Sequence, residues 1–294
     1  MRGLKQVGMG KIEHSRHFMG RRDLLSKVMS FRPSPRAAAS GQMPSDGAIS
    51  ITTPTRTALL TQIAALLAAR KSFAVATLNL DHLVKLRRDP AFRAAYAAQS
   101  HVVADGNPVV WLQRLAGRPV ELIPGSELIE PVVAMAARLG VPVALLGSTA
   151  ETLALTSARL KADHPLLVIV ACIAPPQGFD PEGQGGETAL TQLAAAGARL
   201  CLVALGAPKQ EVLAARGLRM LPETGFVSIG AGLDFIAGTQ RRAPLWVRRI
   251  AMEWLWRMAL SPRRLARRYL DCALILPGLA LDAWASRVSR TKQP

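Results

Sequence analysis

An aspartate near residue 100 is the side chain best placed for chemistry. The apolar run His101–Ala104 leads directly to Asp105. Asn107 is a good helix N-cap and Pro108 suits the first helical position, so a short helix is predicted to follow and to stop at Gly117. Asp105 then stands at the carboxyl end of a strand, where open α/β sheets form their ligand-binding crevices. A carboxylate there could act as a general base, although from this stretch alone capping of the helix explains Asp105 slightly better.

Small and polar residues follow several other predicted strands. Small residues let backbone N–H groups approach a phosphate, and helix N-termini favour anions. A single glycine more often marks only a tight turn, but here small and polar residues recur at several strand ends. Together these residues suit the binding of a nucleotide diphosphate. The candidate substrate-binding residues at these ends are Thr77, Asn79, Gly106, Asn107, Gly147, Gly206, Pro208, Lys209, Gln210 and Gly232.

Two of these candidates open a predicted helix. Lys209 or Gln210 could hold a diphosphate or a sugar hydroxyl, and an ordinary solvated first turn explains them equally well. His82 and His101 flank the same region, and both are interpreted as structural more readily than as substrate contacts.

Other nucleotide and metal motifs are absent from the sequence. The chain has no Gly-x-x-x-x-Gly-Lys-Ser/Thr loop and no dinucleotide fingerprint with its following acid, which counts against an ATPase or an ordinary dehydrogenase. It has no Asp-x-Asp, no His-Glu-x-x-His and no paired cysteine spacing. No metal site and no cofactor are therefore predicted.

Strand-like and helix-like segments alternate through the central part of the chain. Strands separated by helices of about ten residues imply right-handed crossovers and a mostly parallel sheet that is covered on both faces. The predicted fold is a Rossmann-like α/β body at residues 53–240. A disordered basic tail at 1–52 precedes it, and a basic, Arg/Trp-rich helical appendage at 241–294 follows it. The strands are predicted at 73–79, 101–105, 141–146, 166–173, 199–205 and 226–229.

Positive charge is concentrated at the two ends of the chain. The formal net charge is +17, but residues 41–240 carry sixteen basic and fifteen acidic side chains. Basic ends could meet nucleic acid or an anionic membrane face. Four of the five tryptophans lie beyond residue 240, and no RNA-binding or zinc-finger signature occurs, which favours the membrane surface over nucleic acid.

Three scattered cysteines are typical of a reducing cytoplasm.

The appendage is predicted to lie on a membrane and not to cross it. Trp246, Ile250, Trp254 and Met258 recur every four residues, which predicts one strong amphipathic helix over 244–260. Pro262 ends it, and a short arginine-rich helix is expected to follow. The last apolar run is broken by a Pro-Gly pair and is shorter than the roughly 20 residues that a spanning helix needs. The alternative is a helix that packs on the body with solvated arginines.

Several motifs, in order over about residues 55–270, resemble the WecG/TagA/CpsF family of bacterial glycosyltransferases (glycosyltransferase family 26). The last two are long and unusual in composition, which makes the resemblance specific. The motifs are Thr77-Leu-Asn79, Ala104-Asp105-Gly106, Leu205-Gly206-Ala-Pro208-Lys209-Gln210-Glu211, Gly232-Leu-Asp234-Phe-Ile-Ala-Gly238, Arg242-Ala-Pro244, Glu253-Trp254-Leu-Trp-Arg257 and Pro262-Arg-Arg264 through Tyr269.

The resemblance implies an inverting hexosyltransferase that requires no metal. The donor would be a UDP-sugar and the acceptor a sugar linked to polyprenyl diphosphate, at the inner face of the cell membrane, in cell-surface or exopolysaccharide synthesis. It makes Asp105 the catalytic base and places Thr77, Asn79 and Gln210 on the substrate. Arg242, Arg257, Arg264, Arg267 and Arg268 would meet the acceptor diphosphate or the membrane.

Some points stay open at the level of sequence. Members similar to the wall-teichoic and enterobacterial enzymes often carry an arginine shortly before the glycine that matches Gly125. Leu122-Ile123-Pro124 stand here instead, so the resemblance does not imply a donor sugar. Association into homo-oligomers is also open. Two other interpretations are a nucleotide-sugar-binding protein without transferase activity and a nucleic-acid binder with basic tails.

Overall fold

The structure, a computed structural model, describes residues 50–240, 242–244, 246–247 and 250–291. These belong to the larger of two units into which the chain divides, residues 40–294. Most of the predicted tail, residues 1–52, lies outside the described part. Its last residues do not: the Thr52 N–H donates to the Val102 carbonyl at 3.0 Å, and Thr52 Oγ1 accepts from the Val102 N–H at 2.7 Å. The fold thus includes Thr52, one residue before the predicted body.

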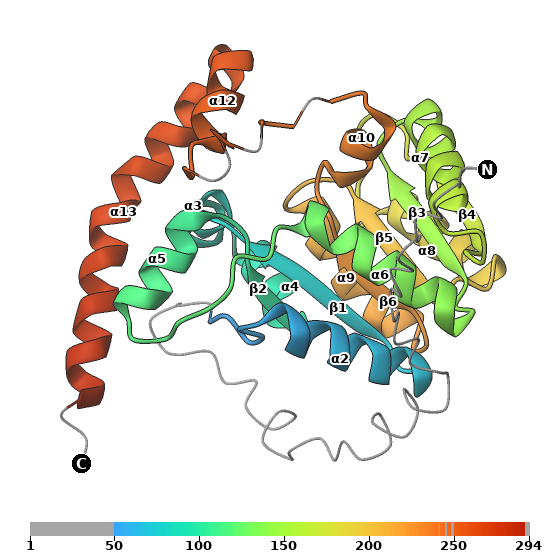
Figure 1. Cartoon of the computed structure of the whole chain (residues 1–294), viewed down its shortest axis with the longest axis horizontal. Helices are drawn as coiled ribbons and strands as arrows, with labels where there is room; N and C mark the ends of the chain where they lie inside the picture. The colour runs from blue at the N-terminus through green and yellow to red at the C-terminus, as the bar shows by residue number, and fades with distance from the viewer. Residues whose placement is uncertain (1–49, 241, 245, 248–249, 292–294) are drawn as a thin grey trace, which may run out of the picture. The chain divides into compact units, whose positions relative to one another are not determined.

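The described strands form one six-stranded, all-parallel sheet in the order β2-β1-β6-β5-β3-β4 (Figure 1). This confirms the predicted α/β class with a mostly parallel sheet. Because all strands run the same way, their carboxyl ends meet along one edge of the sheet. The strands are β1 (Phe73–Leu78), β2 (His101–Ala104), β3 (Val143–Gly147), β4 (Ile169–Ile173), β5 (Leu200–Ala204) and β6 (Gly225–Ser228).

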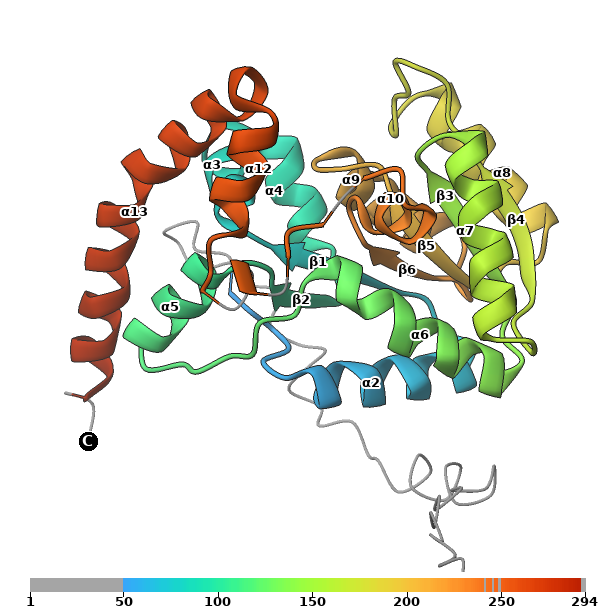
Figure 2. The ribbon, with the colours of Figure 1, turned by 45° about the horizontal axis from the view of Figure 1, so that its top comes forward.

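Helices cover both faces of the sheet, because successive side chains of each strand point to opposite sides. In β1, Phe73 and Val75 face one apolar cluster, while Ala74 and Ala76 face two others. The first face carries α2 (Arg56–Ala68), α6 (Gly125–Leu139), α7 (Ala150–Asp163) and α10 (Gly232–Ala237), and Figure 2 shows α2 and α6 side by side on it. The second carries α3 (Leu80–Arg88), α4 (Pro90–Ala97), α5 (Asn107–Leu115), α8 (Gln184–Ala195) and α9 (Lys209–Met220).

Helix α5 begins one position away from the predicted start. Gly106, and not Asn107, is its N-cap residue, and Asn107 is already helical. Gly106 has a φ of 108°, a value that side-chain-bearing residues rarely adopt, so the chain turns there and the helix starts directly afterwards. Asp105 lies before this turn, between the end of β2 and the N-cap.

The predicted amphipathic helix over 244–260 is wrong as one helix. The helix α12 covers only Glu253–Leu260, and Ala251, with a φ of 61°, stands before it in the left-handed region. The four-residue recurrence of apolar side chains gave no sign of this break, since left-handed alanine is uncommon.

The short arginine-rich helix predicted after Pro262 is instead a long one. The helix α13 runs over Pro262–Thr291 and contains Pro277. Pro277 supplies no N–H, but Ala273, whose carbonyl loses that partner, is exposed and open to water. Packing of α13 against α3 and α5 supports it over this length (Figures 1 and 2). Nowhere in the described chain is a helix long and apolar enough to cross a bilayer.

Candidate active site

Asp105 is fixed beside the end of the neighbouring strand. Its backbone N–H donates to the Leu78 carbonyl at 2.7 Å, which continues the pairing of β2 with β1. Its residue is half-buried, so the carboxylate is sheltered without being enclosed. Thr77, one step back in β1, pairs with Val103 and is only 3% exposed. The sheet therefore brings Asp105 and Thr77 to the same edge.

Asn79 lies at this edge as well and begins a helix. Its Oδ1 accepts the His82 N–H at 3.0 Å, which caps α3. A side chain added at Gly106 would place its Cβ 3.8 Å from the Asn79 Cβ, so the ends of β1 and β2 lie against each other here. With Oδ1 used by the cap, a substrate would meet the Asn79 amide N–H groups.

The two flanking histidines are structural, as interpreted from sequence. The His82 Nδ1 lies 2.7 Å from the Tyr96 hydroxyl, and burial lowers the His82 pKa to about 3. The His101 Nδ1 lies 3.1 Å from Thr53 Oγ1, and burial lowers the His101 pKa to about 4. Both rings are therefore neutral near pH 7 and are held inside the fold.

Gln210 is buried and joins two loops of the site. Its Oε1 accepts the Gly230 N–H at 3.2 Å, and its Nε2 donates to Glu211 Oε1 at 2.8 Å. With 2% of its surface exposed, Gln210 sets the positions of the loops after β5 and β6. The other predicted residue of the second loop, Gly232, is buried at the start of α10 against Ile129.

Glu211 is a buried acid that the sequence analysis did not single out. The residue is fully buried, and its Oε2 has no hydrogen-bond partner among the residues that the structure describes. Burial raises the Glu211 pKa to about 7, although the hydrogen bond from Gln210, a backbone N–H and the charge of Lys85 act in the other direction. Burial also raises the Tyr96 pKa, and the charges of Glu211 and Asp105 add to that rise. In the sequence, Glu211 stood out only as the last residue of the motif that begins at Leu205 and as part of the first turn of a predicted helix.

We expect Glu211→Gln to stabilise the protein at pH 8 and to do so less at pH 5. Between the ordinary value of 4.5 and about 7 the unfolded chain releases this proton while the folded protein keeps it, so the free energy of unfolding falls as pH rises through that window. Glutamine does not titrate, so the variant loses this pH dependence, and its free energy of unfolding at pH 8 rises by roughly 3 kcal/mol at most. Urea denaturation at the two pH values measures it, with the exposed Glu182→Gln as control. An equal change at both pH values would contradict the shifted pKa.

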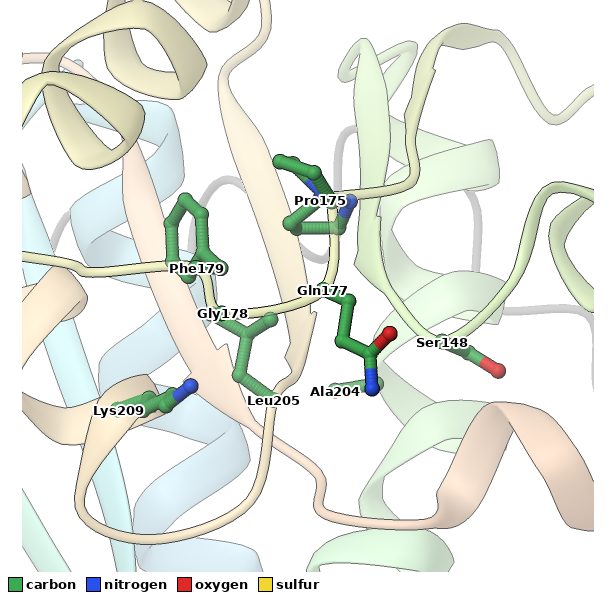
Figure 3. Close-up of a pocket in the computed structure, with 9 residues that line it drawn as sticks. Ser148, Pro175, Gln177, Gly178, Phe179, Ala204, Leu205 and Lys209 are labelled. Carbon is green, nitrogen blue, oxygen red and sulfur yellow. The ribbon is translucent and has the colours of Figure 1, made fainter.

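A pocket of about 340 Å³ lies at the carboxyl ends of β3, β4 and β5 (Figure 3). In Figure 3, Lys209 and Ser148 lie on opposite sides of the Gln177 side chain. Lys209 supplies a cation to the pocket, and Gln177 supplies an amide. The loop Pro175–Phe179 supplies backbone polar groups and the aromatic ring of Phe179. Lys209 could be predicted from the sequence, whereas Gln177 stands in a proline-rich loop without a motif. The pocket can hold a polar ligand with an anionic part.

Two of the predicted glycines have different roles beside this pocket. A Cβ at Gly147, where φ is 118°, would lie 2.2 Å from the Ala204 carbonyl oxygen, so Gly147 allows β3 and β5 to approach. Gly206 is exposed with a φ of 70°, and no heavy atom of the described residues lies within 4 Å of an added Cβ, so a ligand has space beside its backbone. The loop continues through Pro208 into α9. The hydroxyl of Ser148 donates to Asp234 Oδ1 at 2.7 Å and ties the pocket to α10.

Two of the predicted acceptor arginines are paired with carboxylates. Arg242 lies 2.8 Å from Glu127, which Arg56 also contacts at 3.1 Å. Burial alone would raise the Glu127 pKa, but hydrogen bonds from the two arginines bring it below its usual value. Arg268 lies 3.1 Å from Asp81. Of the others, Arg267 is exposed, and the side chains of Arg257 and Arg264 lie outside the described residues.

No group of three His, Cys, Asp or Glu side chains that could hold a metal ion is found within the described part of the chain.

The family comparison agrees with the sequence motifs. The model of the glycosyl transferase WecG/TagA/CpsF family matches residues 47–293, which extends beyond the motifs toward both ends of the chain. The match spans the α/β body and the C-terminal helices, and the resemblance inferred from the motifs is confirmed. The chain belongs to the WecG/TagA/CpsF family of glycosyltransferases.

Proposed function

We propose that this glycosyltransferase moves a hexosyl group from a UDP-sugar to a sugar linked to polyprenyl diphosphate, with inversion, in the synthesis of a cell-surface polymer. The observation that carries the proposal is the position of Asp105. It is a half-buried carboxylate at the strand-end edge, bonded through its backbone to Leu78 and next to Asn79. Family membership supports the reaction class.

The chemistry requires one base. A hydroxyl oxygen of the acceptor sugar attacks the anomeric carbon of the donor from the face opposite the diphosphate. As the new C–O bond forms, Asp105 accepts the hydroxyl proton and the bond between the anomeric carbon and the diphosphate oxygen breaks. UDP leaves with the bonding electrons, and the anomeric configuration is inverted.

Donors along the strand ends can balance the charge on the leaving diphosphate. There is space beside the Gly206 backbone, Lys209 supplies a cation, and Asn79 begins α3 at the same edge of the sheet. The pocket beside Gln177 has the size and polarity for the nucleoside part of the donor. Gln210 supports this arrangement by holding the loop after β6 and does not need to touch the donor.

The lipid-linked acceptor calls for a membrane-facing surface, and α13 offers one. Arg263, Arg267, Leu270, Leu274, Pro277, Leu281 and Trp284 follow one another at spacings of four and three, so they lie on one side of the helix. We name the apolar part, residues 270–284 of this series, the apolar stripe. Its leucines and tryptophan are 58–71% exposed. The two arginines at its start suit anionic headgroups, in line with peripheral binding at the inner membrane face.

Acceptor-dependent release of UDP tests the proposed reaction. The full-length protein is incubated with a synthetic polyprenyl-diphosphate-linked sugar in detergent or vesicles, and with a panel of UDP-hexoses, UDP-N-acetylhexosamines and UDP-uronic acids. We expect one donor to give UDP and an elongated lipid-linked product, with a rate that EDTA does not change. Binding of UDP-sugars without release, for every donor and acceptor, would favour a nucleotide-sugar-binding protein instead.

A further inference from the structure

A line of polar contacts connects the C-terminal helix to the loop after β5. Arg268 of α13 lies 3.1 Å from Asp81 Oδ1, and Lys85 Nζ lies 2.9 Å from Asp81 Oδ2. Lys85 also donates to the Ala207 carbonyl oxygen at 3.1 Å. Three segments far apart in the sequence, α3, the loop at 206–208 and α13, are thereby joined through Asp81 and Lys85.

The centre of this network is protected from water. The side chain of Asp81 is 10% exposed, while those of Lys85 and Arg268 are 37% and 36% exposed. A nearly buried carboxylate requires compensation, and here two cations share it. Lysine has three N–H donors. On Lys85, one of them points to the Asp81 carboxylate and one donates to the Ala207 carbonyl.

The loop that Lys85 reaches is also held by its own backbone and by packing. The Gly206 carbonyl accepts the Gln210 N–H at 3.1 Å, and Ala207 packs against an apolar cluster of the sheet. Lys85 adds a side-chain hydrogen bond at Ala207. Gly206 is exposed, an added Cβ there would have no heavy atom within 4 Å in the described part of the chain, and Pro208 has no N–H to donate. The bond from Lys85 falls on the carbonyl between them. Lys209, the next residue, lines the pocket at the ends of β3, β4 and β5.

We propose that Lys85 is a positioning residue for the 206–208 loop, and that Arg268 couples the docking of α13 to the shape of this loop through Asp81. When Arg268 is docked, Asp81 is divided between two cations and Lys85 reaches Ala207. When Arg268 leaves, Asp81 loses one of its two cations and attracts Lys85 more strongly, which weakens the hydrogen bond of Lys85 to Ala207. The inference rests on the proposed function only in taking this loop to contact the donor.

Hydrogen exchange of the loop tests the inference without any ligand. In the full-length protein, Lys85→Met is expected to speed amide exchange in a peptide spanning residues 205–209, and Arg268→Met to do so in the same direction. Lys85→Arg should restore slow exchange. The matched control is Arg88→Met. Arg88 of α3 lies 3.3 Å from Asp271 of α13, so this variant removes an exposed ion pair between the same two helices and leaves the loop untouched. Helix α2, with Leu59 and Ile63 fully buried, reports that each variant is folded.

Binding of UDP by calorimetry provides the second readout. We expect Lys85→Met to weaken binding about tenfold, the effect of losing one hydrogen bond to a charged group. The double variant with Arg268→Met should be no weaker than Lys85→Met alone, because both act through one path. Unchanged loop exchange in Lys85→Met, or additive effects of the two variants, would overturn the inference. If the wild-type protein binds no UDP, the proposed donor is wrong, and the exchange experiment still decides the role of Lys85.

Discussion

Replacing Asp105 by Asn is expected to lower kcat for sugar transfer by about 10²- to 10⁴-fold, the usual contribution of a positioned general base. Asn has nearly the same size and keeps the backbone bond to Leu78, so the end of β2 should stay intact. It cannot accept the proton of the attacking hydroxyl. Because the donor is expected to meet mainly the loops after β3, β4 and β5, its affinity should change little.

Initial rates of UDP release at saturating donor and acceptor measure this effect. Calorimetry with UDP separates a loss of chemistry from a loss of binding. Asp163→Asn, at an exposed position at the end of α7, serves as the matched control and should keep full activity. If Asp105→Asn retained more than a tenth of the wild-type kcat, another group would have to be the base.

The double variant Leu274→Glu/Leu281→Glu should lower binding to anionic phospholipid vesicles by about 100-fold or more. Each leucine of the apolar stripe gains about 1.5–3 kcal/mol when it is buried, and a glutamate adds repulsion from anionic headgroups. Both side chains are largely exposed in the structure, at 71% and 67%, so the change should not disturb the packing of α13.

Co-sedimentation with vesicles provides the measurement, and a control separates position from composition. Leu155→Glu/Leu166→Glu introduces the same two changes at exposed leucines of the body, on α7 and shortly before β4. That variant should pellet like the wild type. Equal loss in both variants would indicate a general charge effect, and no loss in the first would show that another surface meets the membrane.

The α/β body could be predicted from the sequence because its signals are local. Buried parallel strands produce continuous apolar runs such as Phe73–Leu78, and glycine at the end of α6 marks where that helix stops. The carboxyl ends of such strands meet at one edge whatever their order in the sheet. Asp105 and Thr77 could therefore be placed together before the order was known.

The helix predictions after residue 243 were wrong because tertiary contacts decide the local structure there. The four-residue spacing of Trp246, Ile250 and Trp254 does not reveal that the backbone is left-handed at Ala251 and that α12 begins only at Glu253. Pro277 normally argues against a helix, yet packing on α3 and α5 carries α13 through it.

The site shows the same division between local and tertiary signals. The sequence indicated that Gln210 belongs to it, but not that both ends of its amide are used inside the protein. Nor could it indicate that Arg242 and Arg268 face carboxylates of distant helices, because an ion pair between remote segments leaves no mark in the spacing of either one.

The carboxylate shared by Arg56 and Arg242 limits how this protein can vary. Glu127 stands between two arginines that are 186 positions apart, each within 3.1 Å of it. Loss of Glu127 alone would leave two guanidinium groups facing each other across a half-buried site, so the arginines would become harmful to the fold through no change of their own. Glu127 can therefore be replaced without this cost only after Arg56 or Arg242 has already been replaced. In natural relatives the three positions are expected to change together.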